Sequence, residues 1–395
     1  MNVFDYGVDL SGVCDKCNKK IIMGICACEK TNRKLASIQK ILAVEPIEGA
    51  DNIEKVKVLG WQVVVKKGEF KPGDLCVFFE IDSFLPIREE FEFLRKSSYR
   101  LLEDGKEGFR LKSCKLRKTL SQGLVMPLSI LDGKLTFSAP SGLELGKMME
   151  MAIDKVLSAE EGLDVTEILG ITKYEIAIPV QLKGILEGKF PTEIIPKTDE
   201  IRIQSEPGLI EEMKGKEYYI TVKVDGTSAT FYKHNDKFGV CGRNWEHKLE
   251  SQNAYMQIAQ KYDLQNKLNA LGKNLAIQGE IAGLGIQKNP LGLKELELFV
   301  FSIYDIDNRK YLDLEEFLNT ARELNLRTVP FEGRDLDFDY IMEELIEKAK
   351  GKYVGTQKNR EGIVIRPIKE TYSELLKGRL SFKVVNDDYL LKDEE

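Results

Sequence analysis

The sequence predicts a multidomain chain with three kinds of structure in succession: a small cysteine-rich N-terminus, an all-β barrel, and an α+β domain with antiparallel sheets. Three observations lead to this division. The 395 residues are too many for one ordinary core. Four of the seven cysteines lie between residues 14 and 28. Short strands broken by turn residues precede a long region of mixed strands and helices. We expect boundaries at 1–32, 33–137, a helical linker at 138–200, and 201–395.

The bulk composition is that of a soluble globular protein, with 43% apolar and 31% charged residues. No apolar run approaches the roughly 18 residues that a membrane-spanning helix needs. The first residues, MNVFDYGVDLSG, lack the basic and apolar regions of a signal peptide. We therefore expect an intracellular, cytoplasmic protein without membrane contact. Only two histidines are present, which argues against a histidine-rich metal site and a serine-type triad.

The N-terminal stretch CDKCNKKIIMGICAC carries the spacing C-x2-C-x8-C-x-C, formed by Cys14, Cys17, Cys26 and Cys28. Two turns at this spacing bring four thiolates around one tetrahedral Zn²⁺. The alternatives are ordinary thiols, or two disulfides in an oxidising compartment. Because no secretory signal is visible, disulfides are disfavoured and we expect zinc. Four protein ligands leave no open position, so this zinc knuckle or ribbon would be structural.

Residues 33–137 read as short strands, for example KVKVLGWQVVVKKGE and DLCVFFEIDSFL, separated by the turn sequences PIEGADN and FKPGD. This spacing predicts a small closed barrel. The stretches PIEGADNIEKVKVLG and SCKLRKTLSQGLVMPL resemble the OB-type modules that bind tRNA. The resemblance implies an OB-like domain that binds nucleic acid.

The barrel region also contains a basic stretch, FRLKSCKLRK, with no acidic residue. Basic side chains along strands can follow a phosphate backbone, and an aromatic ring beside them can stack on a base. The other interpretation is an edge strand protected by charge. The candidate RNA-binding residues are Arg110, Lys112, Lys115 and Arg117, beside Phe109.

In the α+β region, the stretch YYITVKVDGTSATFY places Lys223 between two valines in an apolar strand, followed by Asp225 and Gly226. A lysine in such a strand usually extends its amine to solvent. The pattern K-x-D-G alone occurs often by chance. A catalytic interpretation therefore needs support from the rest of the chain.

Five further stretches follow in order, and each alone has an ordinary structural explanation. They are CGRN, AIQGEIAGLGIQKNP, LFVFSIYDI, REGIVIRP and RLSFKVVN. The residues that they present are Arg243, Glu280, Tyr304, Glu361 and Lys383. Together with Lys223, six such residues in this order are hard to attribute to chance.

This order resembles motifs I, Ia, III, IIIa, IV and V of the covalent nucleotidyltransferase superfamily, which contains DNA ligases, RNA ligases and mRNA capping enzymes. GEIAGLGIQ is most similar to the ATP-dependent RNA ligases. DNA ligases and capping enzymes carry an OB domain after motif V, whereas only 12 residues (395 − 383) follow Lys383 here. The resemblance covers roughly residues 33–395 and implies the RNA-ligase branch in which an OB domain precedes an ATP-grasp-like ligase domain.

The resemblance implies an ATP-dependent RNA ligase that seals 5′-phosphate and 3′-hydroxyl ends through lysyl-AMP and an adenylylated strand, in RNA repair. Its RNA would be nicked or tRNA-like. A DNA or mixed-strand ligase is the alternative enzyme. A tRNA- or RNA-binding protein with an inactive ligase-like domain is the alternative without catalysis, although intact Lys223, Asp225, Glu280 and Glu361 argue against decay.

The residue roles implied by the resemblance start from Lys223, which must be neutral to attack ATP although a free lysine has a pKa of about 10.4. We expect burial and a nearby metal cation to depress this pKa. No G-x-x-x-x-G-K-[ST] pattern occurs, so charged side chains and the metal must hold the phosphates. The remaining roles are Mg²⁺ or Mn²⁺ binding through water for Asp225 and Glu361, ribose binding for Glu280, phosphate binding for Arg243, adenine stacking for Tyr304, and α-phosphate binding for Lys383.

Two positions depart from the family pattern. The family often has phenylalanine where Tyr304 stands, so Phe301 is a second candidate for stacking. Motif V is often K-x-K, but Val385 occupies the position of the second lysine. Arg366 and Arg379 are the candidates to replace it.

Overall fold

The computed structural model describes residues 34–102, 105–117, 119–132, 160–174 and 184–390. The cysteines of the predicted zinc site lie outside these residues. The chain divides into two compact units. The N-terminal unit consists mainly of residues 33–180, and the C-terminal unit mainly of residues 181–389. Each unit is described by itself below.

The N-terminal unit contains a five-stranded antiparallel sheet in the order β10-β4-β1-β2-β3. Its inward positions alternate along the chain, so that Trp61, Val63 and Val65 of one strand all point into the core. A register shift between Ile41 and Ala43 bends the long first strand, which lets it pair with two different strands along its length. The strand bounds are β1 (Ala36–Pro46), β2 (Ile53–Val58), β3 (Trp61–Lys66), β4 (Leu75–Phe79) and β10 (Leu124–Pro127).

A second sheet of this unit has the order β11-β5-β7-β6. The elements here are β5 (Ser83–Pro86), η1 (Glu89–Leu94), α1 (Arg95–Ser98), β6 (Tyr99–Leu101), β7 (Glu107–Arg110), η2 (Leu128–Leu131) and β11 (Thr172–Lys173), with a separate hairpin of β8 (Cys114–Leu116) and β9 (Thr119–Ser121). Val165, Leu169 and Ile171 are buried in the core of this unit. This differs from the predicted helical linker at 138–200, because the apolar side chains of residues 160–174 pack into the core of this unit and β11 adds to its sheet. Phe190 and Ile195, from the end of the predicted linker, are buried in the C-terminal unit instead.

The C-terminal unit contains two sheets, a seven-stranded one in the order β12-β17-β16-β15-β18-β19-β20 and a five-stranded one in the order β13-β25-β22-β14-β21. All neighbouring strands are antiparallel except β13 and β25, which confirms the predicted α+β domain with antiparallel sheets. The strand bounds of the larger sheet are β12 (Leu186–Lys189), β15 (Thr227–His234), β16 (Lys237–Cys241), β17 (Trp245–His247), β18 (Leu275–Ala282), β19 (Glu297–Asp305) and β20 (Lys310–Tyr311). Those of the smaller sheet are β13 (Ile201–Arg202), β14 (Tyr218–Lys223), β21 (Phe331–Asp335), β22 (Gly362–Pro367) and β25 (Phe382–Val385).

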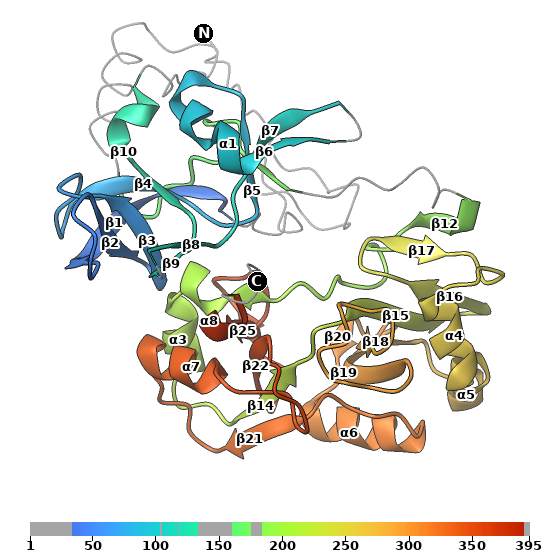
Figure 1. The fold of residues 1–395 in the computed structure, drawn as a ribbon. Helices are drawn as coiled ribbons and strands as arrows, with labels where there is room; N and C mark the ends of the chain where they lie inside the picture. Colours follow the sequence, from blue (N-terminus) through green and yellow to red (C-terminus); the bar gives the residue numbers. More distant parts are fainter. Residues whose placement is uncertain (1–33, 103–104, 118, 133–159, 175–183, 391–395) are drawn as a thin grey trace, which may run out of the picture. The chain divides into compact units, whose positions relative to one another are not determined.

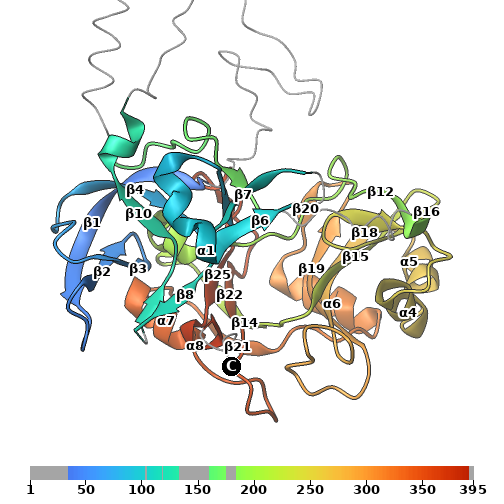
Figure 2. The same ribbon diagram turned by 45° about the horizontal axis from the view of Figure 1, so that its top comes forward.

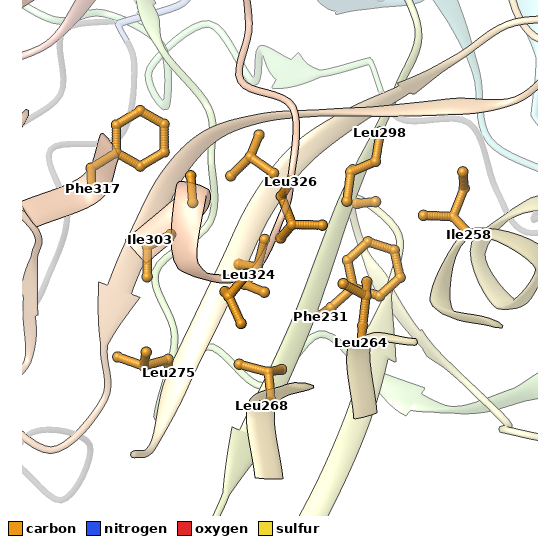
Figure 3. Packing of buried hydrophobic residues seen from close by; sticks show 14 of the residues in the cluster. Phe231, Ile258, Leu264, Leu268, Leu275, Leu298, Ile303, Phe317, Leu324 and Leu326 are labelled. Carbon is orange, nitrogen blue, oxygen red and sulfur yellow. The ribbon is translucent and has the colours of Figure 1, made fainter. Parts of the chain in front are cut away.

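Helices cover each sheet of this unit. The helices α4 (Ala254–Lys261), α5 (Leu264–Leu271) and α6 (Leu314–Glu323) lie against the larger sheet (Figure 1). Their apolar side chains, among them Ile258, Leu264 and Phe317, pack with Phe231 and Ile303 of the strands (Figure 3). The helices α3 (Gly208–Met213) and α7 (Met342–Ala349) cover the smaller sheet (Figure 1). The helix α7 lies beside β22 and β25 (Figure 2). The remaining elements are η4 (Ile203–Ser205), β23 (Tyr372–Ser373), β24 (Gly378–Arg379) and α8 (Asp387–Leu390).

The chain passes from one sheet to the other directly after Lys223. This lysine ends β14 of the smaller sheet, and β15 of the larger sheet begins at Thr227. The three residues between them form a turn against both sheets. Within the described residues, no helix is long and apolar enough to cross a membrane.

Candidate active site

Lys223 and Glu361 form a close ion pair at the ends of two neighbouring strands. Lys223, the last residue of β14, pairs with Gly362, the first residue of β22, and Glu361 directly precedes Gly362 in the chain. The Nζ atom of Lys223 lies 2.6 Å from Oε2 of Glu361, and both side chains are about four-fifths buried, with 23% and 20% exposed. Lys383 comes from the next strand, β25, where it pairs with Val364. Three adjacent strands thus bring three of the predicted residues together.

Glu280 approaches from the other sheet, and Gly226 makes this approach possible. On β18, Glu280 pairs with Ser228 of β15, directly after the turn that follows Lys223. A Cβ atom added at Gly226 would lie 2.3 Å from the carbonyl oxygen of Ile281 and 2.9 Å from Cγ of Glu280. Only glycine lets the turn run this close to β18. The K-x-D-G pattern therefore has a steric reason for its last residue.

The pKa of Lys223 is raised, not depressed as the sequence predicts. Burial lowers it, but the carboxylates of Glu361 and Glu280 outweigh burial and stabilise the charged amine. The prediction considered burial and a metal cation, and it did not include a carboxylate at 2.6 Å. With the protein's own side chains alone, Lys223 is therefore an ammonium at neutral pH.

Two other groups have a pKa near neutrality. Burial raises the pKa of Glu280 to about 7; Lys223 opposes the shift, while Glu361 and Asp225 add to it. Burial also lowers the pKa of Lys383 to about 7, and the positive charges of Lys223 and Arg202 lower it further. The site thus contains crowded charges of both signs, which is the arrangement expected where a charged ligand or cation binds.

Arg202 is a site residue that the sequence analysis missed. It pairs with Lys383 in the parallel ladder of β13 and β25, and its charge acts on the Lys383 amine. A single arginine in a two-residue strand gives no periodic signal, so its position follows only from the pairing with a strand about 180 residues later in the chain.

Two tyrosines that the sequence analysis also missed contact the turn after Lys223. The hydroxyl of Tyr389 donates a hydrogen bond to Oδ2 of Asp225 (2.8 Å). The hydroxyl of Tyr353 hydrogen-bonds to backbone groups at the end of β14 and just before the start of β22. Burial raises the pKa of Tyr353, so its hydroxyl stays protonated at neutral pH.

Arg243 lies on the turn between β16 and β17 and remains accessible. Its Nη2 atom lies 2.7 Å from Oδ1 of Asp199, and its side chain is 58% exposed. The positive charge of Arg243 acts on Glu280. Arg243 is therefore at the edge of the cluster and accessible to a ligand.

The aromatic candidates differ in their surroundings. Tyr304 is buried against Phe190 and Ile195 and contacts the ring of Tyr311 edge-on at 5.0 Å. It pairs with Ala276 on β18, four residues from Glu280, or about 13 Å along the strand at the usual rise.

Phe301 is half-buried and packs against the apolar cluster of Val224 and Phe299. Val224 directly follows the lysine, and Phe299 pairs with Glu280. Phe301 therefore lies closer to the charged cluster than the preferred candidate, Tyr304.

The two arginines expected to replace the second motif V lysine are held in a buried ion-pair network. Arg366 bonds to Glu200 (2.8 Å), to the Ser381 hydroxyl and to the Phe301 carbonyl. Arg379 bonds to Glu370 and to the Ser302 hydroxyl. Because internal partners occupy both guanidinium groups, they are poor candidates for binding phosphate.

In the N-terminal unit, the structure separates Arg110 from the other residues of the basic stretch. Arg110 lies over the ring of Tyr174 at 4.3 Å and 3.6 Å from Asp82, with its side chain 32% exposed. The exposed residues Lys112, Lys115 and Arg117 lie on the strand end and hairpin that follow. Arg110 thus has a packing role in this unit.

Comparison with known families matches both units. An OB-fold domain model matches residues 35–128, and an RNA ligase model matches residues 216–385. The match to residues 35–128 confirms the predicted OB module. No protein with a curated description matches the chain.

Solved structures of Naegleria gruberi RNA ligase are similar over nearly the whole chain. A variant of that ligase with AMP and Mn is 38% identical, covers 91% of this chain and 98% of its own, and has a TM-score of 0.74. A variant with ATP and Mn is 38% identical, covers 90% and 98%, and also has a TM-score of 0.74. The same ligase with PPi is 38% identical, covers 91% and 98%, and has a TM-score of 0.73. With this identity over this coverage, the chain belongs to the RNA ligase family.

Proposed function

We propose that this RNA ligase uses ATP and that Lys223 is its nucleophile, forming lysyl-AMP before AMP passes to RNA. The observation that carries the proposal is the buried Lys223 amine, 2.6 Å from Glu361, within a cluster of acids at the junction of two sheets. The related Naegleria ligase has structures with ATP, AMP and PPi. These are the substrate, the transferred group and the leaving group of such a step.

In the first step, the Lys223 Nζ atom attacks the α-phosphorus of ATP. An N–P bond forms, the bond between the α-phosphorus and the β-phosphate oxygen breaks, and pyrophosphate leaves with the electron pair. The amine must first lose its extra proton, since only the neutral form is a nucleophile. Oε2 of Glu361, at 2.6 Å, is a suitable acceptor for this proton.

The next two steps join the RNA. An oxygen of the RNA 5′-phosphate attacks the α-phosphorus, which releases Lys223 and leaves an adenylylated strand. The 3′-hydroxyl of the other strand then attacks the 5′-phosphate, and AMP leaves. Arg243 is exposed at the edge of the cluster, where it can contact a strand phosphate.

The acids fit a divalent cation. Like-charge repulsion from Asp225 and Glu361 helps to raise the pKa of Glu280, and a cation would relieve it. In the described part of the chain, no three acidic, histidine or cysteine side chains are grouped to hold a metal alone. Asp225 and Glu361 would therefore hold Mg²⁺ or Mn²⁺ together with water and phosphate oxygens, as suits the slow dehydration of Mg²⁺. Such a cation would neutralise charge on the phosphates, and it would weaken the stabilisation that these carboxylates give to the charged Lys223 amine.

The nucleotide contacts are assigned from the same geometry. Glu280 would accept hydrogen bonds from the ribose, and Lys383 would contact the α-phosphate. Arg202, opposite Lys383 in the ladder, would supply the second positive charge that Val385 cannot. Adenine would stack on Tyr304 or on Phe301, and the position of Phe301 beside Val224 favours the latter.

For the N-terminal unit, we propose that the OB module holds RNA through Lys112, Lys115 and Arg117, with nicked or tRNA-like RNA repair as the setting. Lys115 and Arg117 are exposed on the β8–β9 hairpin, and Lys112 is exposed in the segment just before it. For the N-terminal cysteines we retain structural zinc, which rests on their spacing alone.

The test is incubation with ATP labelled on the α-phosphate, followed by denaturing electrophoresis. Wild type should form a covalent AMP adduct and seal RNA with 5′-phosphate and 3′-hydroxyl ends. Lys223→Ala should do neither, yet keep some sealing of a pre-adenylylated strand, because that step needs no lysyl-AMP. Absence of an adduct in wild type would favour an RNA-binding protein. Sealing of DNA in preference to RNA would favour a DNA or mixed-strand ligase.

A further inference from the structure

Tyr353 joins the ends of the two strands that carry Lys223 and Glu361. Its hydroxyl donates to the Lys223 carbonyl oxygen (3.0 Å) and accepts from the Asp225 amide (2.9 Å) and the Glu361 amide (3.2 Å). A tyrosine hydroxyl has one proton to donate and two lone pairs to accept with. All of its hydrogen-bonding capacity is therefore directed to the backbone of three proposed site residues.

These contacts begin where the sheet ladder stops. The last pair between β14 and β22 is Lys223 with Gly362. Beyond it, the two chains diverge, one into the turn at Asp225 and the other toward Glu361. The hydroxyl bonds to backbone groups of both chains at this point, where further ladder bonds would otherwise lie. A buried backbone group without a partner is costly, so the hydroxyl stabilises one relative position of the two strand ends.

Tyr353 is itself held firmly. The residue is 5% exposed. Its amide donates to the Lys358 carbonyl (3.0 Å), and its carbonyl accepts from the Thr356 amide (3.1 Å). Lys352 and Asn359 are bridged across the same loop. The ring thus extends from a closed loop to the strand ends, and its hydroxyl cannot move without disturbing that loop.

We propose that Tyr353 is a positioning residue for lysine adenylylation, which sets the Lys223 amine and the Glu361 carboxylate relative to each other. The inference rests on the proposed function of Lys223. Among the described residues the Tyr353 hydroxyl hydrogen-bonds to backbone groups, whereas the proposed nucleotide contacts come from other side chains. Its loss should therefore slow the chemical step and leave ATP binding nearly unchanged.

The test compares Tyr353→Phe with Tyr340→Phe in the full chain. Phenylalanine keeps the ring and removes the hydroxyl. Tyr340 is a matched control, because its hydroxyl also bonds inside this unit, to the hydroxyl of Tyr218 (3.1 Å). The measurements are the rate of AMP-adduct formation at saturating ATP, the KM for ATP, and thermal unfolding. Rates are compared at a temperature at which all variants are folded.

We expect Tyr353→Phe to form the adduct about 10- to 100-fold more slowly, since displacements near 1 Å can cost 100-fold in rate. Its KM for ATP should stay within about threefold, and Tyr340→Phe should match wild type. A wild-type rate in Tyr353→Phe, a loss confined to KM, or an equal loss in both variants would overturn the proposal. So would a Tyr353→Phe protein that is unfolded at every temperature. An inactive wild type would instead refute the function of Lys223.

Discussion

Gly226→Ala tests the close approach of the two sheets at Lys223. The added Cβ would lie 2.3 Å from the Ile281 carbonyl oxygen, whereas ordinary contact begins near 3.4 Å. The turn or β18 must therefore move by about 1.1 Å (3.4 − 2.3). Movement of this size would separate Lys223 from Glu280. We expect adduct formation to fall about 100-fold. Overpacking should lower the free energy of unfolding by about 1–3 kcal/mol.

Gly333→Ala is the matched control, because a Cβ there would have no atom within 4 Å and its φ is not in the left-handed region. It lies on β21, next to β14 in the same sheet. The assay is the single-turnover rate of AMP-adduct formation, with thermal unfolding measured in parallel. The control should stay near wild type in both. If Gly226→Ala forms the adduct at the wild-type rate, the two sheets do not need this separation, and the steric explanation of the glycine is wrong.

Three further predictions concern other parts of the chain. The pKa of Lys383 is about 7, and only its charged amine would hold phosphate. The KM for ATP should therefore rise about tenfold from pH 6 to pH 8, as the amine loses its proton. Lys383→Met should raise the KM and flatten this rise. Replacing Lys112, Lys115 and Arg117 with glutamine should reduce the log–log salt slope of RNA binding by about 0.7–0.9 per lost contact. Arg110→Gln should mainly lower stability, because Arg110 packs on Tyr174. An unchanged slope in the triple variant would contradict the RNA interface. Protein purified under reducing conditions should contain one zinc per chain, and metal analysis without zinc would contradict the N-terminal site.

The sequence alone predicted the features that depend on local order. Alternating apolar residues and turn residues predicted the strands of both units, because the side chains of a strand face opposite sides in turn. The patterns predict a C-terminal unit of the α+β class with antiparallel sheets and an OB-like N-terminal unit. Lys223, Asp225 and Gly226 are chain neighbours, so their proximity needed no tertiary information. The order of the motifs also predicted the RNA ligase family.

Tertiary structure alone decided the partners of those residues. Tyr353 hydrogen-bonds to the carbonyl of Lys223, which lies 130 positions away in the sequence. Arg366 bonds to Glu200, which lies 166 positions away. Whether an arginine is free for phosphate, or a lysine has a raised pKa, depends on which distant carboxylate packs against it. The raised pKa of Lys223 also depends on a distant residue, since Glu361 lies 138 positions away in the sequence. Such pairings follow from strand order and sheet packing, which local propensities do not encode, and electrostatic interactions depend on these distances directly.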